Sequence, residues 1–146
     1  MKKTIFLLLS VLLMTSCSSL DTRKQTPIYQ QYIADNKLEA LQKITTFRFH
    51  GWRSLNNYFL IVSTSMAKPY LIELNSYCLD LRFANAIVIN NSGSILQTKF
   101  DSVSAANYPN QKCYIKSIYK VTKNQADEIT DLKLNRGENK EQVKSS

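Results

Sequence analysis

The hydrophobic pattern of the chain changes its period near residue 44. Before that point, Thr26-Pro27 predicts a helix start, because a capping residue precedes proline at the first helical position. Asn36 with Glu39 resembles a capping box, so residues 27–43 are predicted to form one broken helix or two short ones. From residue 44 onward, apolar positions recur mainly with period two, which is typical of β-strands.

Six strands are predicted in the middle of the chain. In the first of them, Phe47 and Phe49 share one face, and Trp52 lies on the other. The segment Asn91-Ser92-Gly93-Ser94 is the clearest hairpin signal, so the strands on its two sides are expected to pair. The six predicted strands cover residues 44–53, 58–63, 70–74, 85–90, 95–101 and 112–121.

A second helix is predicted after the last strand. Thr122 and Gln125 resemble another capping box. The helix that they open carries an apolar stripe at helical spacing, formed by Ala126, Ile129 and Leu132. Residues 135–146 are polar and are expected to form a disordered tail.

These elements predict one small domain, residues 27–134, of a mainly β (α+β) class. Short turns between successive strands favour an antiparallel six-stranded sheet or a small barrel. The short N- and C-terminal helices are expected to flank it, covering one face or plugging an open end.

The first 16 residues predict a lipoprotein signal peptide. Lys2 and Lys3 give a positive start, and the apolar run that follows is shorter than the roughly 20 residues that cross a bilayer. The run ends in Met14-Thr15-Ser16-Cys17, which resembles a lipobox. We therefore expect cleavage before Cys17, lipidation of that cysteine and a tether over residues 17–26, which would hold the protein at a membrane. The alternative is an ordinary signal peptide in which Cys17 is not lipidated.

The residues after Cys17 bear on which membrane the lipid enters. Ser18 and Ser19 lack the aspartate that, by resemblance to sorting rules in double-membrane bacteria, retains lipoproteins at the inner membrane. The expected location is the bacterial cell envelope, on the outer membrane facing the periplasm.

Two cysteines remain besides Cys17, namely Cys78 and Cys113. Because the envelope is oxidising, an even pair is most simply a disulfide. It would close a loop of about 36 residues and stabilise the fold by roughly 3–4 kcal/mol at most. A metal pair or a redox site is the alternative, although the chain has no CxxC spacing and His50 is its only histidine.

The excess of basic over acidic residues suggests a negatively charged partner. The formal net charge is +8, but Lys2 and Lys3 leave with the signal peptide, so 17 basic residues face 11 acidic ones and the mature charge is +6. A basic balance suggests nucleic acid, which an exported lipoprotein rarely meets. Anionic lipid, lipopolysaccharide or an acidic protein surface is the preferred partner, and a solvated basic surface without a partner is the alternative.

The middle of the chain resembles the DUF6491 family, uncharacterised small bacterial envelope proteins. The residues that carry the resemblance are Phe47, Trp52, Tyr70-Leu71-Ile72-Glu73-Leu74, Cys78, Asp80-Leu81, Phe100-Asp101-Ser102-Val103 and Cys113-Tyr114-Ile115. The resemblance spans about residues 40–121, so the N-terminal helix and the lysine-rich tail are expected to lie outside the family. It implies an exported domain in which Cys78 pairs with Cys113, and it implies no catalytic residues.

Candidate chemistry is sparse. His50 is the only candidate base for a nucleophilic hydrolase, no G-x-S-x-G elbow is present, and His50 is expected at the surface. Asp80 and Asp101 could serve as the carboxylate pair of a glycosidase, but their positions favour turn capping or pairing with arginine. One histidine and scattered carboxylates do not make a zinc site, so no metal and no cofactor is expected.

The last predicted strand carries one unusual pattern. Its inward face is expected to hold Cys113, Ile115, Ser117, Tyr119 and Val121. Its opposite face would then carry a lysine and tyrosine stripe, which consists of Lys112, Tyr114, Lys116, Ile118 and Lys120. The stripe predicts either contact with an anionic surface or an edge strand whose lysines discourage aggregation.

Together these patterns predict a bacterial envelope lipoprotein that acts as a non-enzymatic binding or interaction module. The alternative is a periplasmic enzyme, or an accessory subunit of one, that uses Asp80 or Asp101. A binding module should expose a basic or aromatic patch, whereas an enzyme should have a concave pocket that holds perturbed carboxylates.

Overall fold

The computed structural model describes residues 26–144, with side chains from residue 27 to residue 133. The predicted signal peptide, Cys17 and the tether up to residue 25 lie outside the described residues. Helices α2 (Thr26–Asp35) and α3 (Lys123–Lys144) stand at the two ends of the described chain, with a short 3-10 helix, η2 (Leu81–Phe83), between β5 and β6. The strands are β1 (Ala40–Leu41), β2 (Lys43–Ile44), β3 (Gly51–Ser54), β4 (Phe59–Ser63), β5 (Pro69–Leu74), β6 (Ile87–Asn90), β7 (Leu96–Gln97), β8 (Ser102–Ala105) and β9 (Cys113–Lys120).

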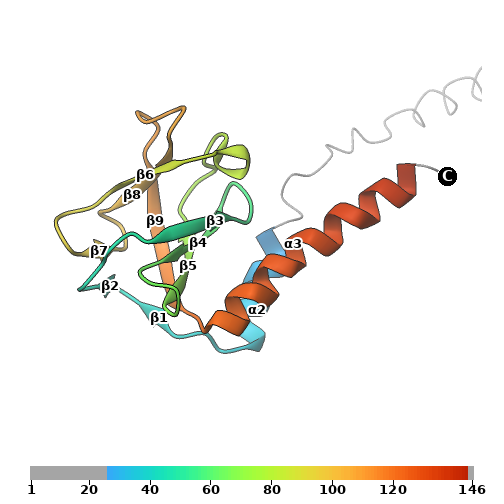
Figure 1. The fold of residues 1–146 in the computed structure, drawn as a ribbon, viewed down its shortest axis with the longest axis horizontal. Coiled ribbons are helices and arrows are strands. Elements are labelled where there is room, and N and C mark those ends of the chain that lie inside the picture. The colour runs from blue at the N-terminus through green and yellow to red at the C-terminus, as the bar shows by residue number, and fades with distance from the viewer. Residues whose placement is uncertain (1–25, 145–146) are drawn as a thin grey trace, which may run out of the picture.

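The main sheet is antiparallel and curls into a half-barrel. Its strands follow the order β3-β4-β5-β9-β8-β6, and β1 also pairs with β9. A separate two-stranded sheet joins β2 to β7. Figure 1 shows both helices on one side of the curled sheet. The prediction of a mainly β domain with an antiparallel sheet and two flanking helices is confirmed.

Two hydrophobic cores lie on the two faces of the sheet. The inner core, inside the curl, consists of Ile44, Phe47, Leu60, Val62, Ile72, Leu74, Cys78, Leu81, Leu96, Val103, Cys113, Ile115 and Ile118. The helix-side core consists of Tyr29, Leu55, Phe59, Ile61, Leu71, Val121, Ala126 and Ile129. β4 contributes alternate residues to both cores, which explains why its sequence is apolar without a break.

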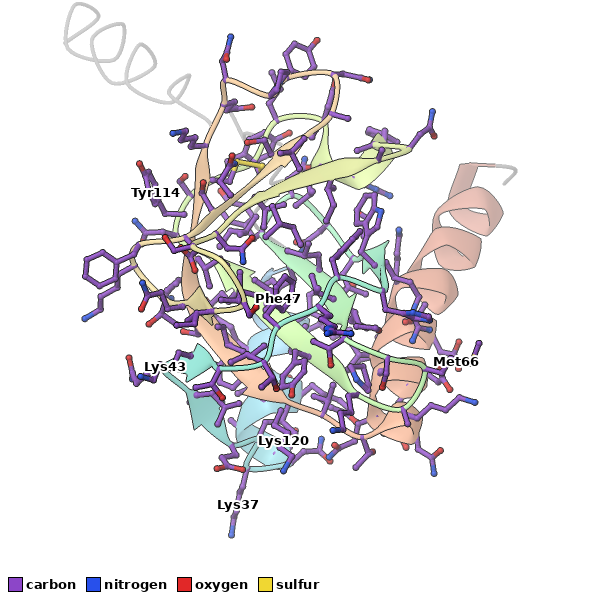
Figure 2. The ribbon with its side chains drawn as sticks, turned by 60° about the vertical axis from the view of Figure 1, so that its left-hand side comes forward. Lys37, Lys43, Phe47, Met66, Tyr114 and Lys120 are labelled. Atoms are coloured by element: carbon purple, nitrogen blue, oxygen red, sulfur yellow. A yellow bond between two sulfur atoms is a disulfide. The ribbon has the colours of Figure 1, made fainter. Side chains whose placement is uncertain are left out.

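Of the first predicted strand, residues 44–53, only the two ends are in strands: Ile44 belongs to β2 and the last part to β3. Residues 45–50 are not in a strand, and the regular pairing of β3 with β4 begins at Gly51. Phe47 is buried in the inner core, whereas Phe49 is 49% exposed, so the prediction that they share one face is wrong. Figure 2 shows Phe47 among the strands at the centre of the domain. The reason is that residues 45–50 do not form a strand, so period-two alternation does not apply to them; the Phe47 N–H donates to the Ser94 carbonyl at 2.7 Å, and the Phe47 side chain packs in the inner core.

The predicted hairpin around Gly93 does not form. A turn is present, with Gly93 at φ 62° and the Asn91 amide donating to the Gly93 and Ile95 carbonyls, both at 2.9 Å. However, β6 pairs with β8, and β7 pairs with β2. The partner strand, β8, is short and rich in serine, so its sequence carries little strand signal although all four residues are buried.

The helices also differ in part from their predictions. α2 forms, but the predicted second start at Asn36 does not, because the Asn36 side chain donates to the Tyr32 carbonyl and Lys37 adopts a left-handed backbone at the end of α2.

The capping box of α3 is confirmed: the Thr122 N–H donates to Gln125 Oε1 at 2.9 Å, and the Gln125 N–H donates to Thr122 Oγ1 at 3.2 Å. α3 continues to Lys144, through most of the segment predicted as a disordered tail. Glutamate, lysine and glutamine are common there, and these residues favour helix even without an apolar face.

The disulfide between Cys78 and Cys113 is confirmed. It joins the loop after β5 to the start of β9, and its two Cα atoms are 5.6 Å apart. Both cysteines are buried in the inner core. The disulfide therefore fastens the half-barrel where β8 and β9 pair.

Candidate functional site

A β-bulge in β9 reorganises the strand that the sequence singled out. Glu73 of β5 pairs with Ser117, but the next residue, Leu74, pairs with Ile115, which leaves Lys116 as the extra residue. Alternation therefore reverses at Lys116. Ile118 faces the inner core together with Ile115, and Tyr119 packs against the helix-side core.

The predicted stripe is consequently not one continuous face. Ile118 is fully buried. β9 is also an interior strand, with β5 on one side and β8 and β1 on the other. The prediction of a single lysine face and the interpretation of β9 as a protected edge strand are both wrong, because the bulge and the short β1 and β8 strands could not be deduced from period-two alternation.

The polar members of the stripe remain exposed but form separate groups. Lys112, Tyr114, Lys116 and Lys120 are all exposed, with Tyr114 at 46%. Figure 2 shows Tyr114 and Lys120 toward opposite ends of β9. Contact of these residues with an anionic surface stays a prediction.

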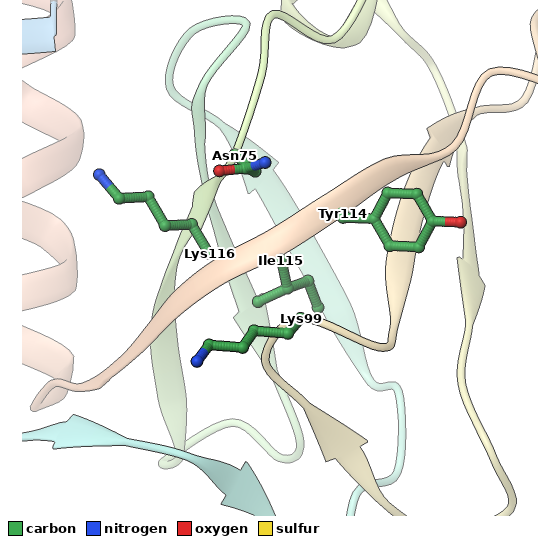
Figure 3. A pocket seen from close by; sticks show the side chains of 5 residues that line it. All are labelled: Asn75, Lys99, Tyr114, Ile115 and Lys116. Carbon is green, nitrogen blue, oxygen red and sulfur yellow. The ribbon is translucent and has the colours of Figure 1, made fainter.

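One end of β9 borders a pocket of about 350 Å³. Its lining residues are Asn75, Lys99, Tyr114, Ile115 and Lys116. The backbone N–H of Asn75 donates to the Tyr114 carbonyl at 2.9 Å, and that of Lys99 donates to the Ile115 carbonyl at 2.7 Å. Figure 3 shows Asn75 and Lys99 on opposite sides of the β9 ribbon. The pocket walls are thus fixed by main-chain hydrogen bonds to the strand between them.

Lys116 at this pocket is paired with a buried carboxylate. Its Nζ lies 2.8 Å from Glu73 Oε1, and Gln30 of α2 donates to the same oxygen at 3.2 Å. The hydrogen bond to Glu73 raises the pKa of Lys116, against the opposing effect of desolvation. The pair explains how Glu73 is accommodated at the boundary of the helix-side core, since a buried carboxylate requires a charged partner.

Lys99 lies in a tight turn that Asp101 holds in place. Asp101 is buried, its Oδ2 accepts the Gln97 N–H at 2.7 Å, and its own N–H donates to the Gln97 carbonyl at 3.3 Å. Lys99 has φ 69°, a left-handed conformation that is uncommon for lysine. The next residue, Phe100, is 74% exposed. The Asp101 carboxylate therefore caps this turn and positions Lys99 at the pocket.

The other candidate catalytic residues lie elsewhere. Asp80 is half-buried at φ 57°, precedes η2 and makes no capping hydrogen bond with its side chain. His50 is exposed, and its backbone N–H donates to the Ser63 carbonyl. Asp80, Asp101 and His50 do not belong to the lining of the 350 Å³ pocket.

A smaller pocket of about 200 Å³ lies toward the other end of β9. It is lined by Ala67, Lys68, Pro69, Tyr70, Lys120 and Val121. Tyr70 and Lys120 are direct neighbours across β5 and β9. Of the four exposed residues of the stripe, Tyr114 and Lys116 thus line one pocket, Lys120 lines the other and Lys112 lines neither.

Sequence reasoning missed Asn75 and Lys99. The sequence pattern places Lys99 in the predicted strand 95–101, where it would be one surface residue among others. The sequence signal that points to it is the aspartate two residues later, because Asp101 is a turn-capping candidate. Asn75 gave no comparable signal.

Among the residues that the structure describes, no group of three or more His, Cys, Asp or Glu side chains could hold a metal ion. Within the same part of the chain, no helix combines the length and the apolar composition needed to cross a membrane.

Comparison with known proteins identifies the family. No curated protein and no solved structure matches the chain. A family described as a family of unknown function (DUF6491) matches residues 1–136. The match is wider than the resemblance over residues 40–121 and includes α2, so the expectation that the N-terminal helix lies outside the family is wrong. The chain belongs to the DUF6491 family, a family of unknown function.

Proposed function

We propose that this protein is a bacterial envelope lipoprotein, anchored through a lipid on Cys17 and facing the periplasm from the outer membrane. Its β domain acts as a non-enzymatic binding module for anionic partners. The anchor rests on the sequence alone, namely the positive start, the short apolar run and the Met14-Thr15-Ser16-Cys17 segment.

The binding role rests on one structural observation above all. Exposed lysine and tyrosine side chains border the two pockets beside β9. Of the two candidate catalytic carboxylates, that of Asp101 is buried and accepts a backbone hydrogen bond. A basic, aromatic surface without a free carboxylate pair suits recognition of an anion better than acid–base chemistry.

The proposed anchor would strengthen weak contacts with the membrane. An extended chain spans at most about 3.3–3.6 Å per residue, so the stretch from Cys17 to Thr26 holds the domain within roughly 30 Å of the lipid. Each lysine close to an anionic leaflet contributes about 1 kcal/mol. At the high effective concentration that a short tether imposes, a few such contacts suffice to orient the domain.

The anchor is tested by metabolic labelling of the full chain with a palmitate analogue. Wild-type protein should be labelled, and Cys17→Ser should accumulate as an unlabelled, larger precursor. Cys78→Ser serves as the matched control, because it also removes one cysteine and should leave labelling intact. Equal labelling of wild type and Cys17→Ser would exclude the anchor.

The anionic contact is tested on the full chain in proteoliposomes by lysine acylation. Phosphatidylcholine membranes with and without phosphatidylglycerol are compared, and modified sites are quantified by mass spectrometry. Lys112 and Lys120 should be acylated more slowly in the anionic membranes, and high salt should remove the difference. Lys37 and Lys123, exposed lysines at the ends of the helices, are internal controls. If all four lysines respond alike, Lys112 and Lys120 do not contact the membrane.

A further inference from the structure

The pocket beside β9 combines an apolar lining with charged groups at its margin. Tyr114, which is 46% exposed, and the aliphatic stems of Lys99 and Lys116 form the apolar part of the lining, and both stems end in ammonium groups. The Ile115 side chain is buried in the inner core, so Ile115 borders the pocket without offering its side chain to a ligand. Its volume of about 350 Å³ is at the lower end of the roughly 300–1,000 Å³ that is typical of small-molecule sites. The size and lining suit a small ligand with an apolar body.

Only one of the two lysine charges remains for a ligand. Lys116 is neutralised by Glu73 at 2.8 Å, and Glu73 is held in turn by Gln30. Lys99 has no carboxylate partner among residues 27–133, where side chains are described. Among the charged residues that line the pocket, Lys99 is therefore the one without a carboxylate partner, and one free ammonium group suits a ligand with a single negative charge.

Lys99 is also held in a conformation that costs energy. A left-handed backbone is unfavourable at a residue with a Cβ, and such residues cluster at functional positions. Here the cost is offset by the Lys99 N–H bond to Ile115 and by the Asp101 cap of the turn. The same contacts place Lys99 next to β9 before any ligand arrives, so little ordering of the chain is required on binding.

We propose that this pocket binds a small amphiphile that carries one negative charge, such as a carboxylate on a short apolar chain. The Lys99 ammonium contacts the anionic head, and Tyr114 and the aliphatic stem of Lys116 contact the apolar body. The proposal rests on the proposed binding role and names its ligand class, but it does not require the membrane contact of Lys112 and Lys120.

The test uses the full chain in phosphatidylcholine nanodiscs and an octanoate that carries a diazirine at its apolar end. Irradiation should crosslink peptides that contain Asn75, Lys99 or Tyr114. Unlabelled octanoate should suppress the crosslinks in a saturable manner. Octanol, which lacks the charge, and inorganic phosphate, which lacks the apolar body, should each require at least tenfold higher concentrations.

Variants distinguish binding at this pocket from non-specific attraction of the anion to positively charged residues. The quantity measured is the concentration of unlabelled octanoate that halves crosslinking. Lys99→Gln should raise this concentration at least tenfold, and Lys99→Arg should return it to the wild-type value. Lys37→Gln is the matched control, because Lys37 is also exposed with a left-handed backbone (φ 47°) but does not line the pocket, so its loss should leave the value unchanged. Thermal unfolding of each variant checks that the fold is intact.

Three outcomes would overturn the proposal: crosslinks confined to other peptides, equal suppression by octanol, or an unchanged value in a folded Lys99→Gln variant. Failure of the lysine-acylation experiment would leave these measurements unaffected, since Lys112 and Lys120 do not line this pocket. The two proposals therefore fail independently.

Discussion

Single side chains carry the links between the helices and the sheet. Gln30 of α2 and Lys116 of β9 both bind Glu73, so one buried carboxylate joins the first helix to the bulge. Tyr32 of α2 donates a hydrogen bond to Glu128 of α3. These polar contacts supplement the apolar packing of the helix-side core and fix how the helices sit on the sheet.

The Tyr32–Glu128 contact predicts a dependence of stability on alkaline pH. Desolvation, the hydrogen bond to Glu128 and the Glu128 charge raise the pKa of Tyr32 to about 12 from its ordinary 10.0. Because the folded state holds this proton more tightly than the unfolded state, the stabilisation is complete below pH 10 and is lost as the pH rises toward 12. Urea unfolding of Tyr32→Phe should therefore show a shallower fall in the free energy of unfolding over this range than wild type.

Glu128→Gln separates the causes of this effect. The amide keeps a hydrogen-bond acceptor but removes the negative charge, so the slope of stability against pH should lie between those of wild type and Tyr32→Phe. If wild type and Tyr32→Phe lose stability in parallel from pH 10 to pH 12, the contact does not exist in solution.

At the scale of elements, two short irregularities decide the geometry of the candidate site. The bulge at Lys116 reverses the alternation of β9, and the turn from Gln97 to Asp101 separates β7 from β8. Without the bulge, Ile118 would leave the inner core. Without the turn, Lys99 would continue a strand and would not meet β9.

Asp101→Asn should destabilise the protein, whereas Asp80→Asn should not. The Asp101 carboxylate accepts a backbone hydrogen bond while buried, and the loss of its charge should lower the free energy of unfolding by about 1–2 kcal/mol. Asp80 caps no backbone group with its side chain, and asparagine tolerates its left-handed backbone, so Asp80→Asn should stay within about 0.5 kcal/mol of wild type.

Chemical denaturation of the two variants side by side measures the difference. The pair is matched, since each exchanges one carboxylate for an amide in a non-helical segment. An Asp101→Asn variant as stable as Asp80→Asn would contradict the structural role of Asp101 and reopen a role in chemistry.

The whole molecule is a half-barrel with a core on each face. The sheet does not close by pairing its first and last strands; Phe47, Leu81 and Leu96 fill the inner core beside them. The helices cover the opposite face, where Arg53 pairs with Asp127 at 3.0 Å. Cys78–Cys113 ties the loop after β5 to the β8–β9 end of the sheet, where regular pairing is short.

Removal of the disulfide should cost a large share of the stability of the domain. Its cysteines are 35 positions apart, which corresponds to at most about 3–4 kcal/mol from constraint of the unfolded chain. We expect Cys78→Ala/Cys113→Ala to lower the free energy of urea unfolding by up to this amount. Wild type unfolded under reducing conditions is the control and should show a similar loss. A loss below about 1 kcal/mol in both would show that the inner core alone holds this end of the sheet.

The sequence by itself determined the class of fold, the presence of a helix toward each end of the described chain, the capping box of α3 and the disulfide. These features depend on local chemistry or on counting: period-two alternation, two hydrogen bonds within four residues, and one remaining cysteine pair. The predicted lipidation of Cys17 is of the same local kind, but it lies outside the described residues and stays a prediction.

Only the tertiary structure decided strand pairing, the faces of β9 and the composition of the pocket. Pairing of β6 with β8 depends on burial between segments that are distant in sequence, and the serine-rich β8 carries almost no local signal for it. The bulge depends on the register of β9 against β5, which no pattern within β9 records. Lys99 and Lys116 meet at one pocket because a turn and a bulge bring them to the same strand, and that convergence exists only in the folded chain.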